Sequence, residues 1–483
     1  MLSKDTFVVM TLIQNMRNPK AYLCILGFLS LFSLCACNEK YGKDDYKAYF
    51  GGEVQNPQNP YVLLYKDTKV IDTLLLNEKN RFFKKFDSLA PGLYSFVHEP
   101  EYQYVYFEKN DSILVSINSQ DFDESIVFSG RGEQKNNFLM EMYLRNQRDW
   151  DILLQVMDYN FNEFEKTIKQ VHEKNIKFYQ DKKEFIKWSD NFDVFAKAAL
   201  EMPYYSKKEV YPILHQLRTG KDIVEQLPKN YYDYRQNIDF NNVLLSVYSP
   251  FVKYLSYMLN NMAVINYHNH FSDADLSLKT NINKMNIADT LIQNEKVKNI
   301  ILNNIAFTYL LEDQNMAKNQ KFMEVYHRYS TDRSQKNEIT KIGSAIQLLK
   351  TNQSLPEVKL RKIDGSIISS NTFPKQKTVI FFWTDNAQNH MMQAHKKVID
   401  LKSKYPAYNF IGVNLDKNPK KWVQIVEKSK FQDVTELQVL DFNDLKYKWA
   451  ITKIHRTIIL DENKAIKNAF TNLFNNDIEE YLK

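Results

Sequence analysis

The side chains that could perform thiol chemistry lie at one end of this sequence. The chain has 483 residues and three cysteines, Cys24, Cys35 and Cys37, so no cysteine follows position 37. A thiolate is the attacking group in disulfide exchange and in cysteine-dependent hydrolysis, and it is also a frequent zinc ligand. After Cys37 the chain can therefore form neither an internal disulfide nor a catalytic thiolate.

Histidines and carboxylates offer a second kind of chemistry. The segment His268-Asn269-His270 is followed by Asp273 and Asp275. Imidazole nitrogens and carboxylate oxygens are common ligands of divalent metals, so this group is a candidate metal site. The surrounding residues are polar, however, and a solvated loop between two helices is the favoured interpretation.

Familiar catalytic motifs are missing. His172-Glu173 begins as a zinc-protease helix does, but Ile176 stands where the second histidine is required. The sequence contains no phosphate-binding glycine-rich loop, no Gly-x-Ser-x-Gly elbow and no dinucleotide-binding fingerprint. We therefore expect no cofactor, and no established class of hydrolase or nucleotide-dependent enzyme is indicated.

The composition is that of a folded protein with more than one domain. Hydrophobic residues make up 44% and charged residues 25% of the chain, and the length suggests about two to four domains. Lys and Arg number 64 against 58 Asp and Glu, which gives a net charge of +6 without a basic block. This balance is not typical of nucleic-acid binding, so we expect no nucleic-acid partner.

Residues 1–36 have the order of features that marks an export signal. Arg17 and Lys20 precede an apolar run over 21–36. The run is shorter than the ~18–20 apolar residues that a membrane-spanning helix needs. We therefore predict a cleaved secretory signal, with an uncleaved anchor as the alternative.

The end of this run resembles the bacterial lipoprotein signal. It reads Leu34-Cys35-Ala36-Cys37. The pattern is a leucine, two small residues and a cysteine; Leu34, Ala36 and Cys37 fit it, and Cys35 is a tolerated departure. The resemblance implies that Cys37 becomes the acylated first residue of the mature chain, followed by a linker over 37–45. It also implies an exported protein of the cell envelope that contacts a membrane through its lipid and faces the periplasm. Initiation at Met16 is a secondary hypothesis.

Two regions with different periodicity follow the linker. Over 46–132, short β-branched or aromatic runs alternate with turns rich in Asn, Asp, Pro and Gly, which predicts an antiparallel β-sandwich. Over 133–350, apolar residues recur every three or four positions, which predicts helices. Prolines divide this second region into several helices; they are Pro203, Pro212, Pro228 and Pro250.

The region 351–483 alternates strands and helices. We predict buried strands at Thr378–Trp383, Asn409–Leu415 and Thr457–Asp461, with helices between the first two and after Pro419. Such alternation is typical of an α/β domain with parallel strands. The fold class predicted for the whole chain is thus multidomain α+β, with a sandwich, a helical middle and a C-terminal α/β domain.

The C-terminal region resembles the thioredoxin-like family, in its membrane-tethered periplasmic branch. The resemblance covers about a quarter of the chain and is carried by Asp364-Gly365, Phe382-Trp383, Gly412-Val413-Asn414-Leu415-Asp416 and Ile458-Ile459-Leu460-Asp461. Region 46–132 is similar to the β-rich domain that often precedes such a domain in envelope lipoproteins, on Gly51-Gly52-Glu53-Val54 and Gly130-Arg131-Gly132.

The residues that carry the family's chemistry are replaced. The resemblance places Ala387 at the nucleophilic cysteine, His390 at the resolving cysteine and His455 at the cis-proline. Without a thiol at either position, we expect neither thiol–disulfide exchange nor a peroxiredoxin-type reaction. The fold would bring His390 and His455 together near Asp385, which makes these three residues a weaker candidate metal site.

Three functional hypotheses follow from the resemblance. The first is a non-catalytic envelope lipoprotein whose degenerate thioredoxin-like domain binds or scaffolds a partner protein. The second is a repurposed enzyme or metal site at His390 and His455. The third is an accessory to a thiol–disulfide oxidoreductase system. The joint loss of both thiols and the proline favours the first.

Overall fold

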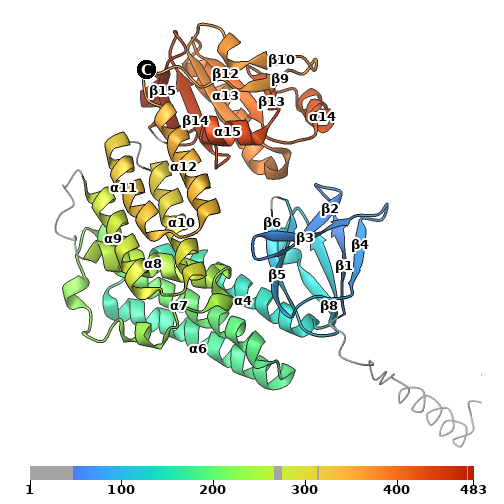
Figure 1. The fold of residues 1–483 in the computed structure, drawn as a ribbon, viewed down its shortest axis with the longest axis vertical. Coiled ribbons are helices and arrows are strands. Elements are labelled where there is room, and N and C mark those ends of the chain that lie inside the picture. Colours follow the sequence, from blue (N-terminus) through green and yellow to red (C-terminus); the bar gives the residue numbers. More distant parts are fainter. Residues whose placement is uncertain (1–46, 100, 152, 266–274, 313–314, 476) are drawn as a thin grey trace, which may run out of the picture.

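The computed structural model describes residues 47–483, apart from 100, 152, 266–274, 313–314 and 476. The predicted signal, the linker, Cys37 and the group from His268 to Asp273 lie outside the described residues. The described chain folds as multidomain α+β, which confirms the predicted fold class (Figure 1). The exact domain boundaries stay predictions. No described helix has the length and apolar character needed to cross a membrane.

Two four-stranded sheets pack over one apolar core at the N-terminal end. The first sheet has the order β4-β1-β7-β8, formed by Arg81–Phe86, Ala48–Gln55, Ser112–Asn118 and Val127–Arg131. The second has the order β3-β2-β5-β6, formed by Lys69–Leu75, Tyr61–Lys66, Gly92–His98 and Glu101–Phe107. Phe50 of one sheet and Phe96 of the other are fully buried with ring centroids 5.9 Å apart, so the sheets share a core. β1 and β7 pair in parallel, so the sandwich is mixed rather than purely antiparallel.

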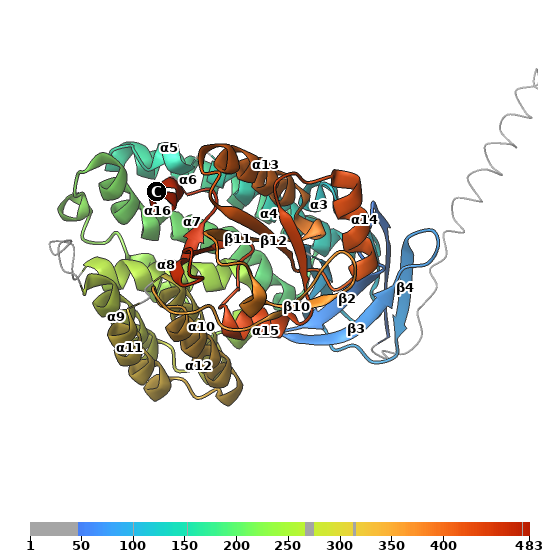
Figure 2. The ribbon, with the colours of Figure 1, turned by 90° about the horizontal axis from the view of Figure 1, so that it is seen from above.

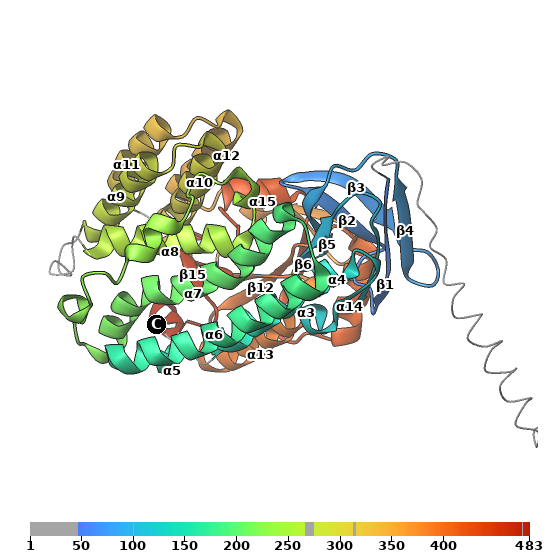
Figure 3. The ribbon, with the colours of Figure 1, turned by 90° about the horizontal axis from the view of Figure 1, so that it is seen from below.

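Helices fill the middle of the chain. After the short α3 (Phe122–Ser125), they are α4 (Glu133–Asp151), α5 (Leu153–Val156), α6 (Phe161–Ile186), α7 (Asp190–Thr219), α8 (Ser249–Ile265), α9 (Leu276–Leu291), α10 (Glu295–Glu312), α11 (Met316–Tyr329) and α12 (Arg333–Leu348). Figure 3 shows α4 leading from the sandwich toward the long helices α6 and α7. As the periodicity of 133–350 predicts, these helices bury apolar residues at helical spacing, such as Phe164 and Ile168 in α6 and Ile301 and Ile305 in α10.

Two of the four prolines lie in the interior of a single helix. Helix α7 continues through Pro203 and Pro212, so the predicted breaks at these positions are wrong. A proline inside a helix has no N–H, and the carbonyl four residues earlier loses its partner. Here distant side chains replace the missing donors: Asn146 Nδ2 donates to Ala199 O at 3.0 Å, and the Tyr231 hydroxyl donates to Lys208 O at 3.0 Å. Tertiary hydrogen bonds thus complete the helix.

The C-terminal part is a seven-stranded mixed sheet with helices on both faces. Its order is β10-β9-β13-β12-β11-β14-β15, formed by Ile367–Ser369, Lys359–Arg361, Thr435–Val439, Asn409–Asn414, Thr378–Trp383, Arg456–Leu460 and Ile466–Asn472. The helices are α13 (Gln388–Lys404), α14 (Pro419–Ser429), α15 (Phe442–Lys448) and α16 (Ile478–Leu482). Figure 2 shows α13 and α15 on opposite sides of β11 and β12. The three strands predicted here are present.

Alternate residues of β11 belong to two different cores. Phe381 and Trp383 pack under α13 and α14, whereas Ile380 and Phe382 join the core of the helical region. This second core also contains Ile342 and Ile346 of α12 and reaches Tyr106 of the sandwich. The helical region therefore packs on both of its neighbours.

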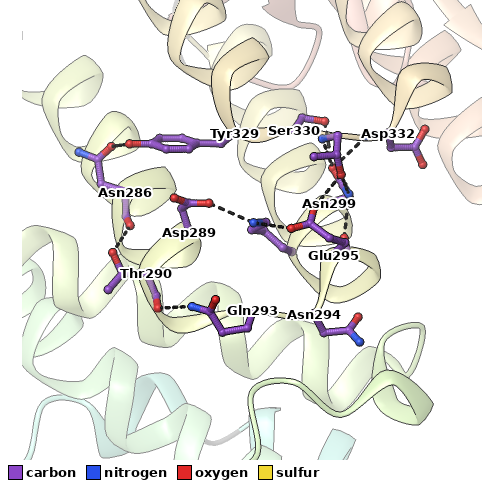
Figure 4. Close-up of polar contacts among 12 residues, drawn as sticks. Asn286, Asp289, Thr290, Gln293, Asn294, Glu295, Asn299, Tyr329, Ser330 and Asp332 are labelled. Atoms are coloured by element: carbon purple, nitrogen blue, oxygen red, sulfur yellow. Dashed lines mark hydrogen bonds and ion pairs between the residues drawn. The ribbon is translucent and has the colours of Figure 1, made fainter.

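A buried polar network ties α10 to the start of α12 (Figure 4). The Asn299 amide donates to Glu295 O at 2.7 Å and to Thr331 Oγ1 at 2.8 Å. Its carbonyl oxygen accepts hydrogen bonds from the backbone N–H of Thr331 at 2.8 Å and from Ser330 Oγ at 3.1 Å. The adjacent Lys298 ammonium pairs with Asp289 at 3.1 Å and with Glu295 at 2.7 Å. These contacts fix the turn between α11 and α12.

We predict that Asn299→Ala lowers the free energy of unfolding by about 2–3 kcal/mol, because several donors and acceptors lose a buried partner. Urea unfolding of the full chain measures this loss, and hydrogen exchange should show it in α10 and α12. Asn286→Ala is the control, since Asn286 is exposed and accepts one hydrogen bond from the Tyr329 hydroxyl at 3.0 Å. Equal effects of the two substitutions would contradict the role assigned to the network.

Candidate functional site

The candidate site is the junction between β11 and α13. The strand ends at the fully buried Trp383, and a single 3-10 turn over Asp385–Ala387 leads into the helix. Asp416, beyond the end of β12, holds this turn: its carboxylate accepts hydrogen bonds from the Thr384 hydroxyl and, at 2.8 Å, from the backbone N–H of Asp385. The Asn414 amide also donates to Asp416 at 2.8 Å. The turn is therefore anchored to the neighbouring parallel strand.

The structure brings His390 and His455 together. Ala387 is the N-cap residue of α13, and His390 follows in the first turn. The ring centroids of His390 and His455 lie 4.7 Å apart at an interplanar angle of 73°, and the Phe474 ring lies 5.8 Å from that of His390. The Nδ1 atom of His390 is buried and has no hydrogen-bond partner among the described residues. One polar ring atom is thus buried at the start of the helix without a partner among the described residues.

Electrostatics keep the His390 imidazole neutral near pH 7. Burial, followed by the nearby rings of His455 and His395, lowers the pKa of His390 from 6.5 to about 4. A neutral imidazole can donate or accept a hydrogen bond but carries no charge to attract an anion. The start of α13 therefore contributes the methyl group of Ala387 and the imidazole of His390 but no thiol, and the phenyl ring of Phe474 lies beside them.

Asp385 is engaged elsewhere. Its carboxylate lies 2.6 Å from the Lys421 ammonium, and the side chain of Asp385 is 10% exposed. Within the described residues, no three His, Cys, Asp or Glu side chains gather as a metal site would require. Asp275, the described member of the other candidate group, pairs with Lys318 at 3.1 Å.

The sandwich borders the candidate site through Lys421. The Lys421 ammonium also donates to the backbone carbonyl of Gln58, in the loop between β1 and β2, at 3.2 Å. The backbone N–H of Gln58 donates to His98 Nε2 at 3.0 Å, so His98 Nδ1 carries the proton that it shares with Tyr61 O at 3.0 Å. Burial lowers the pKa of His98, which favours this neutral form. Polar contacts therefore connect the first domain to the β11–α13 turn.

A buried group behind the turn was not predicted. The Trp383 indole N–H donates to Glu436 Oε2 at 2.9 Å, and His395 Nε2 lies 2.9 Å from Glu436 Oε1. Burial raises the pKa of Glu436. A Cβ at Gly412 would lie 2.8 Å from Glu436 Oε1, so only glycine leaves room for the carboxylate. Gly412 within a buried strand was the one signal in the sequence that could have indicated this close approach.

Comparison with known proteins identifies the class of the C-terminal domain. A family model described as thioredoxin-like matches residues 375–466, which include β11, α13, β12, α14, β13, α15 and β14. The chain therefore carries a thioredoxin-like domain at its C-terminal end. The match ends at β15 and does not include the sandwich or the helical region. No curated protein matches the chain in sequence.

Several solved structures are similar to part of the chain. They include the thioredoxin domain of a thiol-disulfide oxidoreductase from Bacteroides vulgatus, with 20% identity over 28% of this chain and 99% of that one, at a TM-score of 0.24. A thiol:disulfide interchange protein from a Bacteroides species has 18% identity over 25% of this chain and 80% of its own, at a TM-score of 0.21. A thiol peroxidase from Chromobacterium violaceum has 12% identity over 24% of this chain and 73% of its own, at a TM-score of 0.22.

We predict that His390 titrates near pH 4 and that His455→Ala moves its pKa upward, because one charge that opposes protonation is removed. NMR titration of the imidazole signals measures both values. Because the lowered pKa favours the neutral form in the folded state, His390 contributes stability above pH 6.5 that is lost as the pH falls toward about 4. His172→Gln, in α6, is the control and should leave the titration of His390 unchanged.

Proposed function

We propose that this chain is a non-catalytic, lipid-anchored envelope protein whose thioredoxin-like domain binds or scaffolds a partner. The observation that carries the proposal is the identity of the residues at the β11–α13 junction, none of which is a cysteine. The resemblance to the thioredoxin-like family assigns Ala387 and His390 to the positions of the two thiols, and no cysteine follows Cys37 in the sequence. The chemistry of disulfide exchange requires a thiolate at this point, because the helix N-terminus acts by lowering the pKa of a thiol.

The lining of the junction supports a binding role. Ala387 is half-buried, His390 is neutral near pH 7, and the Phe474 ring beside it is 41% exposed. An exposed aromatic ring beside an uncharged imidazole suits an apolar segment of a partner protein, which could cover the ring. The Asp385–Lys421 ion pair counts against a metal-dependent enzyme at the same place, because it occupies the carboxylate.

The first test concerns thiol chemistry, in a background in which Cys24, Cys35 and Cys37 are all replaced by serine, so that no thiol remains. We predict that the chain does not accelerate insulin reduction by dithiothreitol. The Ala387→Cys/His390→Cys variant should accelerate it by about tenfold or more, because the helix N-terminus then activates a restored thiol pair. Ala387→Ser/His390→Ser is the matched control and should remain inactive. Acceleration by the triple-serine protein itself would contradict the non-catalytic proposal.

The second test concerns the anchor. We predict that cells fed an alkyne-labelled fatty acid incorporate it into the full-length protein and that Cys37→Ser abolishes this incorporation. The mature protein should partition into detergent, and its first residue by mass spectrometry should be Cys37. Cys35→Ser is the control that should keep the label. Label retained by Cys37→Ser would exclude lipid attachment at that residue.

A further inference from the structure

A second concave site lies outside the thioredoxin-like domain, between the sandwich and the helices. It is a cavity of about 490 Å³ formed by β6, α3, α4, α7 and α8. This volume falls in the range of roughly 300–1,000 Å³ that is typical of small-molecule sites. The candidate site at Ala387 and His390 does not contribute to it.

Aromatic rings form much of the cavity wall. The rings are those of Tyr102, Tyr104, Tyr143, Trp150, Tyr248 and Tyr257. Several are held in place by their neighbours: the Tyr104 hydroxyl accepts a hydrogen bond from Ser249 N–H at 2.9 Å, and its ring packs edge-on against Tyr248 with centroids 5.1 Å apart. The faces of aromatic rings are electron-rich and attract cations.

Helix α7 supplies another part of the wall. Pro203 lines the cavity, and the carbonyl that this proline frees, Ala199 O, accepts the hydrogen bond from Asn146 Nδ2. Asn146 and Ala199 also line the cavity. The contact fixes α4 against α7 at this point, so the cavity is built into the packing of these helices.

Negative charge gathers at one end of the cavity. Asp123 accepts hydrogen bonds from the Tyr143 hydroxyl at 2.8 Å and from Gln103 Nε2 at 3.2 Å. Glu101 lies nearby, and burial together with the charge of Asp123 raises its pKa. In the described part of the chain neither carboxylate forms an ion pair with a basic side chain. The basic residue that lines the cavity is the exposed Lys253, so the carboxylates outnumber it.

We propose that this cavity binds an organic cation, an ammonium or guanidinium group carried on an apolar body. Such a group would place its charge between the two carboxylates and the ring faces, where it relieves the repulsion between Glu101 and Asp123. Its apolar body would cover the rings of Trp150 and Tyr257, which lie 6.1 Å apart. A free amine and an arginine side chain of a peptide share this chemistry.

The test compares each cation with a neutral molecule of the same shape, using the full chain and isothermal titration calorimetry. Choline is paired with 3,3-dimethylbutan-1-ol, and an acetylated Ala-Arg-Ala amide is paired with its citrulline counterpart. We expect at least one cation to bind about tenfold more tightly than its neutral partner. Binding of choline would identify a free amine as the ligand, and binding of the arginine peptide alone would identify a peptide side chain.

Variants locate the binding. Glu101→Gln should weaken binding of the cation about three- to tenfold and leave binding of the neutral partner unchanged. Lys253→Gln should strengthen binding of the cation, because it removes a like charge. Glu78→Gln, an exposed acid between β3 and β4, is the control without effect. No preference for either cation up to roughly 10 mM, or a preference that Glu101→Gln leaves intact, would overturn the proposal.

Discussion

One continuous apolar core determines how the parts of this protein are arranged. It includes the inner faces of the helices, Ile380 and Phe382 of β11, and Tyr106 of the sandwich. Because adjacent residues of a strand point to opposite faces, β11 contributes to this core with one set of side chains and to the core under α13 with the other. The position of the β11–α13 turn is thus fixed by the helical region as well as by its own domain.

The candidate site is a strand-to-helix junction within the thioredoxin-like domain. Asp416 and Asn414 anchor the turn, and α13 begins where a reactive thiol would gain from the helix N-terminus. The residues present there, a methyl group and a neutral imidazole, gain little from that field. The Glu436, His395 and Trp383 group behind the turn stabilises its position from within the domain.

Sequence reasoning succeeded where local patterns decide the structure. The apolar run at 378–383 predicted strand β11, and Pro419 predicted the start of helix α14. The family resemblance predicted that His390 and His455 lie close together, as they do. Sequence reasoning failed where contacts between residues far apart in the chain determine the structure. The ion pair of Asp385 with Lys421 and the pair of Glu436 with His395 join residues far apart in the sequence, and neither leaves a local signature.

The two internal prolines of α7 have a consequence for the order of folding. One freed carbonyl is satisfied by Asn146, which precedes the helix in the chain, and the other by Tyr231, which follows it. A segment cut out at the ends of α7 lacks both donors and would form an incomplete helix in water. During synthesis α7 cannot reach its final hydrogen bonding until the ribosome has passed residue 231, so the helix becomes complete only together with its surroundings.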